Sequence, residues 1–143
     1  MINQPIRKPN LRALTVRQQW AWAIFHAGKD IENRSWRNKY SIGTIAIHAS
    51  GNADSIDGLP ARVRRPEADA LVRRAIIGLV DVVRIVERSR SRWFNGPLGW
   101  VLTNPRRLSK PIACTGRLGL WPLTRALERR VEDQLGRRRT TRT

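Results

Sequence analysis

Residues 75–87 (AIIGLVDVVRIVE) constrain the fold more than any other part of the chain. β-Branched residues dominate this segment and both of its faces are apolar, which is typical of a strand in the middle of a sheet. No uninterrupted apolar run approaches the roughly 20 residues that a membrane-spanning helix needs. A chain of 143 residues is about the size that one core can organise. We therefore predict one soluble domain built around this central strand.

Alternating and helical patterns predict the elements on either side of the central strand. Further strands are expected over residues 11–17, 31–36, 43–48, 100–103 and 111–115, and helices over residues 18–27, 62–74 and 123–135. Loops are expected over residues 51–60 and 93–99 because they are rich in turn-forming residues. The order of these elements predicts an α+β fold in which helices pack on a curled, mostly antiparallel sheet.

The charge of the chain points to a polyanionic partner. The 28 basic and 11 acidic residues give a net charge of +17, and only four of the basic residues are lysines. Arginine binds phosphate with a planar fork and stacks on bases, so this composition favours nucleic acid. A GC-rich genome and the need for solubility also raise the arginine content, so charge alone leaves both explanations open. Residues 137–143 are expected to form a basic, disordered tail, and residues 1–10 a flexible lead-in.

Cysteine and histidine are too few to form a metal site. Cys114 is the only cysteine, so it has no partner for an internal disulfide, and His26 and His48 lack any metal-ligand spacing. Residues 1–10 contain no apolar stretch of the kind found in secretion signals. We therefore expect a cytoplasmic protein with no metal, no cofactor and no membrane partner, whereas its oligomeric state stays open.

Four segments together resemble proteins of the ASCH domain family, within the PUA-like superfamily. They are residues 14–36 (LTVRQQWAWAIFHAGKDIENRSW), 45–50 (IAIHAS), 76–83 (IIGLVDVV) and 99–116 (GWVLTNPRRLSKPIACTG), in matching order and spacing. The resemblance covers about residues 11–123 and implies a small curled β-barrel with helices packed against it, and the domain is predicted over residues 11–136. It also implies that nucleic acid binds in a cleft between the first helix and the barrel. Gln19 stands where many relatives have proline, which changes a helix-start signal and not the chemistry.

Lys29, Glu32 and Arg34 form the first candidate site, around the turn after the first predicted helix. Glu32 and Arg34 lie on one face of a strand, so a cation, a carboxylate and a guanidinium would meet near the cleft and could bind a phosphate or a base edge. The alternative is an ion pair between Glu32 and Arg34 that needs no ligand. The resemblance favours a binding role for Lys29 and Arg34.

Other candidates lie near the same cleft. Trp20 and Trp22 fit a buried helix better than a stacking platform, whereas Trp36 and Trp93 are flanked by arginine and loop residues and are better placed to stack on a base. Arg17 and Gln18 end the first strand and could reach the cleft, but they could instead cap the helix and face solvent. His48 could instead be a hydrogen-bonded core residue. The predicted nucleic-acid-binding residues are Arg17, Gln18, Lys29, Arg34, Trp36, Arg37, His48 and Trp93.

Asp81 is interpreted as structural. It shares a strand face with Leu79 and Val83, so it is expected to be buried and paired, with an arginine of a neighbouring strand as the partner.

Two functions follow from these residues. The first is a binding module for RNA or single-stranded DNA, including strands with a modified base. The second is a hydrolase, since ASCH relatives include ribonucleases and amidohydrolases acting on acetylated cytidine. Lys29 would be the catalytic group, with a pKa that Arg34 lowers, and Glu32 is the second candidate. Against catalysis, Glu32 stands where the amidohydrolase pattern has a hydroxyl residue, and its charge would keep Lys29 protonated. A protein-interaction role has no sequence feature in its favour.

Overall fold

The structure, a computed structural model, describes residues 10–36, 42–51, 59–63, 66 and 71–135. Residues 1–9 of the predicted lead-in, most of the predicted loop over 51–60, the predicted tail over 137–143 and Arg37 lie outside the described residues.

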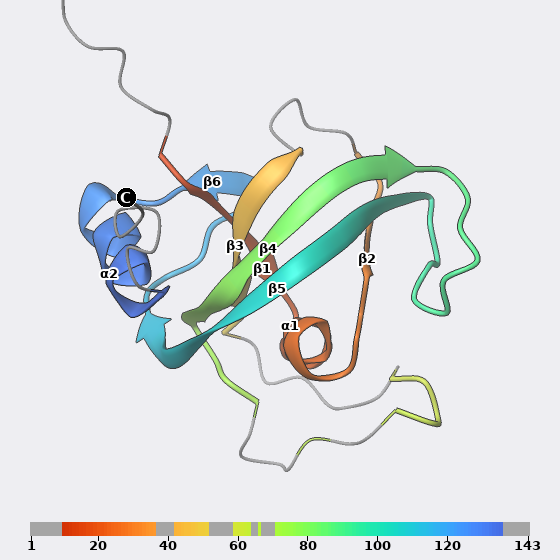
Figure 1. Ribbon diagram of the computed structural model, residues 1–143, viewed down its shortest axis with the longest axis horizontal. Helices are drawn as coiled ribbons and strands as arrows, with labels where there is room; N and C mark the ends of the chain where they lie inside the picture. The colour runs from red at the N-terminus through yellow and green to blue at the C-terminus, as the bar shows by residue number, and fades with distance from the viewer. Residues whose placement is uncertain (1–9, 37–41, 52–58, 64–65, 67–70, 136–143) are drawn as a thin grey trace, which may run out of the picture.

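Within this part of the chain, six strands form one curled, half-barrel sheet with two helices packed on it (Figure 1). The elements in chain order are β1 (Arg12–Val16), α1 (Gln18–His26), β2 (Ile31–Arg34), β3 (Gly43–Ala49), β4 (Ala75–Val86), β5 (Leu98–Ala113), β6 (Leu120–Pro122) and α2 (Arg125–Leu135). The strand order is β2-β5-β4-β3-β1-β6, with β1 parallel to β3 and the other neighbouring pairs antiparallel. The predicted α+β class and the central place of β4 are therefore confirmed.

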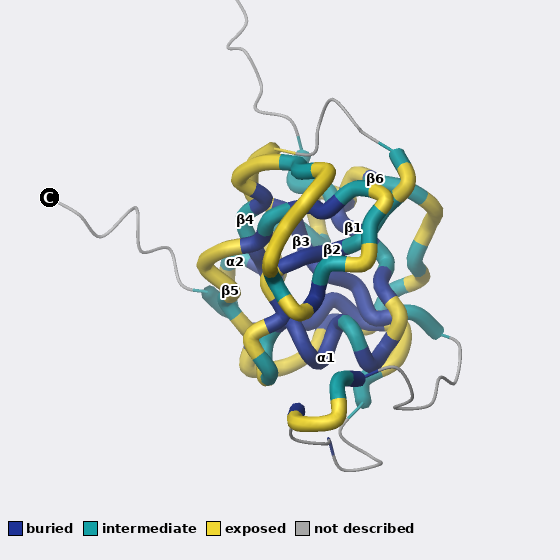
Figure 2. The backbone as a smooth tube through the Cα atoms, turned by 90° about the vertical axis from the view of Figure 1, so that its right-hand side faces the viewer, coloured by how far each residue is buried: buried dark blue, intermediate teal, exposed yellow. Residues whose placement is uncertain are grey.

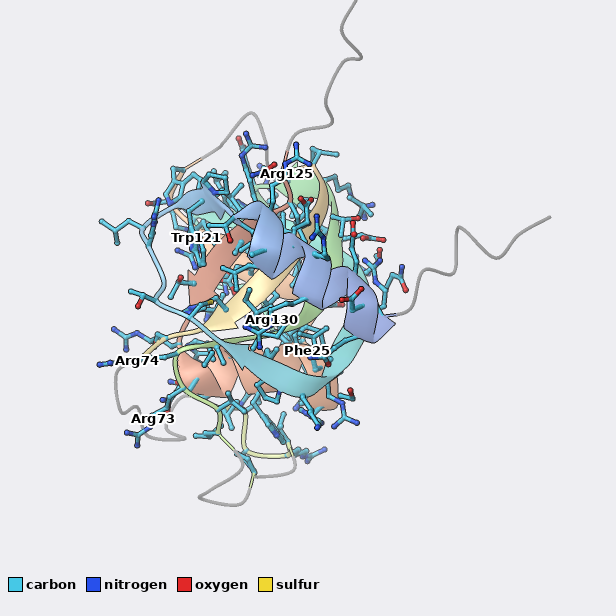
Figure 3. The ribbon with its side chains drawn as sticks, turned by 90° about the vertical axis from the view of Figure 1, so that its left-hand side faces the viewer. Phe25, Arg73, Arg74, Trp121, Arg125 and Arg130 are labelled. Atoms are coloured by element: carbon cyan, nitrogen blue, oxygen red, sulfur yellow. The ribbon has the colours of Figure 1, made fainter. Side chains whose placement is uncertain are left out.

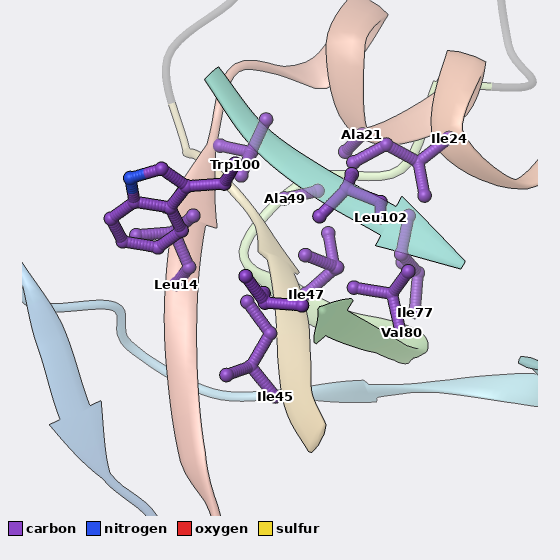
Figure 4. Close-up of a cluster of buried hydrophobic side chains, with 12 residues drawn as sticks. Leu14, Ala21, Ile24, Ile45, Ile47, Ala49, Ile77, Val80, Trp100 and Leu102 are labelled. Carbon is purple, nitrogen blue, oxygen red and sulfur yellow. The ribbon is translucent and has the colours of Figure 1, made fainter. Parts of the chain in front are cut away.

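The two helices cover opposite faces of the sheet. On β1, Leu14 and Val16 join the core beneath α1, whereas Ala13, which precedes them, joins the core beneath α2. Figure 4 shows Ala21 and Ile24 of α1 above the first of these cores. The backbone of the central strands and of much of α1 is buried (Figure 2). Both faces of the sheet are thus used for packing, which explains why β3 and β4 are apolar on both sides.

The helix predicted over residues 62–74 is wrong for the described part of that segment. Arg62, Val63, Pro66 and residues 71–74 have no helical conformation, and Arg74 has a positive φ of 52°. Proline lacks a backbone N–H and disfavours the helical conformation in the residue before it. Val63 packs beside α1 and β2 in one cluster while Val72 packs against another, so the segment is held by separate contacts.

The two strands predicted over 100–103 and 111–115 are one strand, β5, which also takes in the end of the predicted loop over 93–99. Asn104 and Pro105 lie between the two predicted strands, and Asn104 has a positive φ of 54°. The register between β4 and β5 shifts beside them, between the pairs Leu79/Arg106 and Asp81/Thr103. A β-bulge accommodates a residue that lacks a ladder hydrogen bond, so the strand bends and continues. The short strand β6 was not predicted, and β2 ends at Arg34 instead of Trp36.

Asp81 forms the predicted ion pair across two strands, with Arg106 of β5 as the partner. Thr44 Oγ1 and Asn104 Nδ2 also donate to the Asp81 carboxylate, at 2.8 and 3.1 Å. Partial burial acts to raise the pKa of Asp81, but the hydrogen bonds from Thr44 and Asn104 and the charge of Arg106 outweigh it and lower the pKa. The carboxylate is half-buried and not fully buried as expected. The pair holds the bulged part of β5 against β4.

Candidate nucleic-acid interface

Lys29 is placed under α1 by the turn that ends the helix. Gly28 adopts a left-handed conformation, with φ of 71°, and the backbone N–H of Lys29 donates to the carbonyl of Ala23 at 3.1 Å. This reversal directs the lysine side chain inward, where only 5% of it is exposed. Burial of a lysine is rare unless its ammonium has partners.

The partners of Lys29 are a carbonyl and two indole rings. Its Nζ donates to the carbonyl oxygen of Ile31 at 2.5 Å and lies 5.3 and 5.5 Å from the ring centroids of Trp20 and Trp93. Both rings attract the cation through their π-electrons. Burial lowers the pKa of Lys29 and outweighs the charges of Glu32 and Asp30, which raise it.

A cavity of about 230 Å³ adjoins this lysine. We call it the Lys29 cavity, and its lining residues come from α1, from β2 and its preceding turn, and from the loops before and after β4: Trp20, Lys29, Glu32, Asn33, Pro60, Arg92, Trp93 and Asn95. The cavity combines aromatic walls with cationic, carboxylate and amide groups. It can therefore take a flat, polar ligand that offers both hydrogen-bond donors and acceptors.

Asn33 fixes the wall of the Lys29 cavity that comes from the β4–β5 loop. Its Nδ2 donates to the carbonyl of Trp93 at 2.9 Å, and its Oδ1 accepts from the backbone N–H groups of Asn95 and Gly96 at 2.8 and 3.0 Å. The loop thus takes its position from one amide side chain on β2. Trp93 is consequently buried, at 5% exposed, and contributes to the core as well as to the cavity.

Glu32 and Arg34 form the ion pair that was the alternative interpretation. Arg34 Nη2 lies 3.0 Å from Glu32 Oε2 and also donates to the carbonyl of Thr15 at 3.1 Å. Glu32 lines the Lys29 cavity, whereas Arg34 is not among the described lining residues. Arg34 therefore positions Glu32 and ties β2 to the end of β1.

The remaining predicted residues are dispersed. Arg17 is exposed at the start of α1, and Gln18 is buried and lines a separate cavity of about 320 Å³. Trp36 is half-buried and packs edge-on against Trp100, with ring centroids 5.1 Å apart. His48 is buried between β1 and the segment after β5. Of the eight predicted binding residues, the Lys29 cavity brings together Lys29 and Trp93.

Sequence reasoning missed several lining residues of the Lys29 cavity. Trp20 was assigned to the core, but it is half-buried and forms a wall, while Trp22 is buried and stacks on His26. The helical pattern could not separate these two tryptophans because they lie on adjacent stripes. The other missed residues are Asn33, Pro60, Arg92 and Asn95.

The environment of Lys29 gives a prediction that NMR can check. Glu32 is the largest of the charges that raise the pKa of Lys29, so Glu32→Gln is expected to lower this pKa further below 10.5. The measurement is a pH titration of the Lys29 ¹³Cε shift in both proteins. Asp30→Asn is the matched comparison and should lower the pKa less, because Asp30 is the weaker of the two carboxylate effects. An unchanged or raised pKa in Glu32→Gln would contradict the described geometry.

The comparisons with known proteins agree with this fold. The ASCH domain model matches residues 14–112, from β1 to the end of β5. No curated protein sequence matches the chain. Among the described residues, no helix has the length and apolar character to cross a membrane. Since the match covers most of its length, the chain belongs to the ASCH domain family, whose PUA-like modules are generally associated with RNA binding.

Proposed function

We propose that the chain binds single-stranded nucleic acid, RNA or DNA, and that the Lys29 cavity receives one unstacked base. The observation that carries this proposal is the ammonium of Lys29 between the rings of Trp20 and Trp93, beside the carboxylate of Glu32. A base offers a flat face to an aromatic wall and donors and acceptors along its edge. The volume of about 230 Å³ is smaller than the roughly 300–1,000 Å³ of pockets for drug-sized ligands, which suits a single base.

Arg92 supports the same proposal at the rim of the cavity. It is exposed, and its guanidinium lies 5.9 Å from the ring centroid of Trp93. A phosphate attached to a base in the cavity would therefore meet a cation, within a chain of net charge +17. A single strand is favoured over a duplex because a paired, stacked base has to be flipped out before it can enter. A modified base would be read by the same edge contacts.

A hydrolase that uses Lys29 is the second candidate. The lowered pKa of Lys29 favours it, because a neutral amine can act as a base or a nucleophile. The hydrogen bond from Nζ to Ile31 and the nearby Glu32 oppose it, since both hold the ammonium form in place.

A salt titration with product analysis tests the binding proposal. Labelled single-stranded RNA, single-stranded DNA and duplex DNA of one sequence are titrated by fluorescence anisotropy at several salt concentrations. We expect a single strand to bind more tightly than the duplex and to stay intact. Lys29→Met should weaken binding, because it removes the ammonium from the wall that faces the base. Lys110→Met, which removes the charge of an exposed lysine on β5, is the control.

Two results would overturn this assignment. Absence of binding to all three nucleic acids would refute the module. A cleaved product that disappears in Lys29→Met would replace it with the hydrolase.

A further inference from the structure

A second cavity, of about 470 Å³, lies at the end of the sheet where β1, β3 and β5 finish and β4 begins. We call it the Arg74 cavity. Its lining includes Thr15, His48, Ser50, Arg74, Gly116 and Arg117. It shares none of its lining residues with the Lys29 cavity. Whatever it binds therefore uses different side chains.

Two arginines give the Arg74 cavity a positive charge. Arg74 and Arg117 are exposed, no carboxylate is among the described lining residues, and no described carboxylate forms an ion pair with either arginine. Figure 3 shows Arg74 on the same face of the molecule as Trp121, whose ring packs against His48 with centroids 5.5 Å apart. Guanidinium groups that lack an acidic partner are suited to bind phosphate.

The position of Arg74 depends on its backbone and on Gly51. Its positive φ of 52° is unusual for arginine, and its carbonyl accepts from Cys114 N–H at 2.9 Å. The side chain lies directly over Gly51, where an added Cβ would come within 2.4 Å of Arg74 Nε. Gly51 therefore provides the space in which this guanidinium lies beside the cavity.

Gly116 packs just as closely against Thr15 and His48 in another part of the cavity wall. A Cβ added to Gly116 would come within 2.6 Å of both Thr15 Oγ1 and His48 Cε1, so only glycine lets this backbone lie on them. His48 Nε2 contacts the carbonyl of Cys114 at 2.8 Å, and its Nδ1 lies 3.3 Å from Thr15 Oγ1. Burial lowers the pKa of His48 although the Cys114 carbonyl acts to raise it, which favours the neutral imidazole.

One polar atom in the wall lacks a protein partner. The hydroxyl oxygen of Ser50 is buried and makes no hydrogen bond in the described structure. A buried hydroxyl without a partner is costly, and a ligand oxygen would satisfy it.

We propose that the Arg74 cavity is a phosphate-binding site, in which Arg74 and Arg117 bind the phosphate oxygens and the Ser50 hydroxyl donates to one of them. The phosphate belongs to a nucleotide or to a nucleic-acid strand, and only the second source rests on the function proposed above. Thr15 connects the two cavities, because its carbonyl accepts from Arg34, the ion-pair partner of Glu32 in the wall of the Lys29 cavity.

The test is an NMR titration of the ¹⁵N-labelled chain with inorganic phosphate, adenosine monophosphate and adenosine. Phosphate and the monophosphate should shift the amide signals of Gly51, Gly116 and Arg117, and adenosine should leave them unchanged. Arg117→Ala should weaken monophosphate binding by about tenfold or more. Arg74→Gly should do the same, because glycine tolerates the positive φ and removes the guanidinium. Arg129→Ala, on the exposed side of α2, is the control.

The outcomes separate the source of the phosphate from the existence of the site. A weaker single-strand affinity in Arg117→Ala, with a salt slope smaller by about 0.7, supports the strand as the source. Impaired monophosphate binding with unchanged strand affinity supports a free nucleotide. Absent amide shifts, or unchanged affinity in both arginine variants, would overturn the site. Lys29→Met should leave unchanged the shifts that inorganic phosphate, which has no base, causes at Gly51, Gly116 and Arg117, so failure of the Lys29 cavity and failure of the Arg74 cavity are distinguishable.

Discussion

Replacing Trp100 with alanine is expected to lower the free energy of unfolding by about 3–5 kcal/mol. Trp100 lies in the interior strand β5, has no exposed surface, and packs in the core beneath α1 with Leu14 and Ile45 (Figure 4). Its ring also supports Trp36 edge-on. Alanine would leave a void among side chains that belong to different strands and cannot all close in. Urea denaturation followed by far-ultraviolet circular dichroism measures the change.

Trp100→Phe removes less volume at the same position. The indole Nε1 of Trp100 has no hydrogen-bond partner in the described structure, so phenylalanine gives up no such bond. Its cost should therefore be clearly smaller than that of Trp100→Ala, at about 1–2 kcal/mol. Equal losses in the two variants, or a loss below about 1 kcal/mol in Trp100→Ala, would contradict this account of the core.

Trp20→Ala is expected to weaken single-strand binding by about 5- to 150-fold, which corresponds to roughly 1–3 kcal/mol for one stacked base. Trp20 is half-buried, so its ring is available to a base, and it also contacts the ammonium of Lys29. Its removal deletes a wall of the Lys29 cavity and loosens the lysine at once. Anisotropy titration at constant salt measures the affinity, and circular dichroism establishes that the variant is folded.

Trp36→Ala is the matched control for Trp20→Ala. Trp36 is also a half-buried tryptophan, but it packs on Trp100 and does not line the Lys29 cavity. Its replacement should cost stability and leave the affinity nearly unchanged. If Trp36→Ala lowers the affinity as much as Trp20→Ala does, the base does not bind where we propose.

Local patterns were enough to predict the strands and helices whose residues pack in a regular order. β4 was recognisable because an interior strand buries both faces, and α2 because Leu127, Val131 and Leu135 recur along one side. The helix predicted over 62–74 was wrong for the described residues of that segment, and the two strands predicted over 100–103 and 111–115 are one strand. In each case the conformation depends on what the segment packs against, which local propensity does not contain.

The Lys29 cavity could be predicted only in part, for a similar reason. Lys29 and Glu32 belong to one short segment, so their spacing and the family resemblance identified them. The opposite wall is brought in by the hydrogen bond from Asn33 to Trp93, residues 60 positions apart in the chain. That contact depends on the pairing of β2 with β5. The local sequence of neither segment predicts this pairing.

The two edge strands also affect how the protein behaves at high concentration. An open sheet can recruit strands from other molecules along its edges, which is a common route to aggregation. β2 is short and carries Glu32 and Arg34, and β6 has three residues and ends in Pro122, which lacks a backbone N–H. An incoming chain would find few backbone groups to pair with on either strand. The curled sheet therefore resists edge-to-edge polymerisation without having to close into a complete barrel.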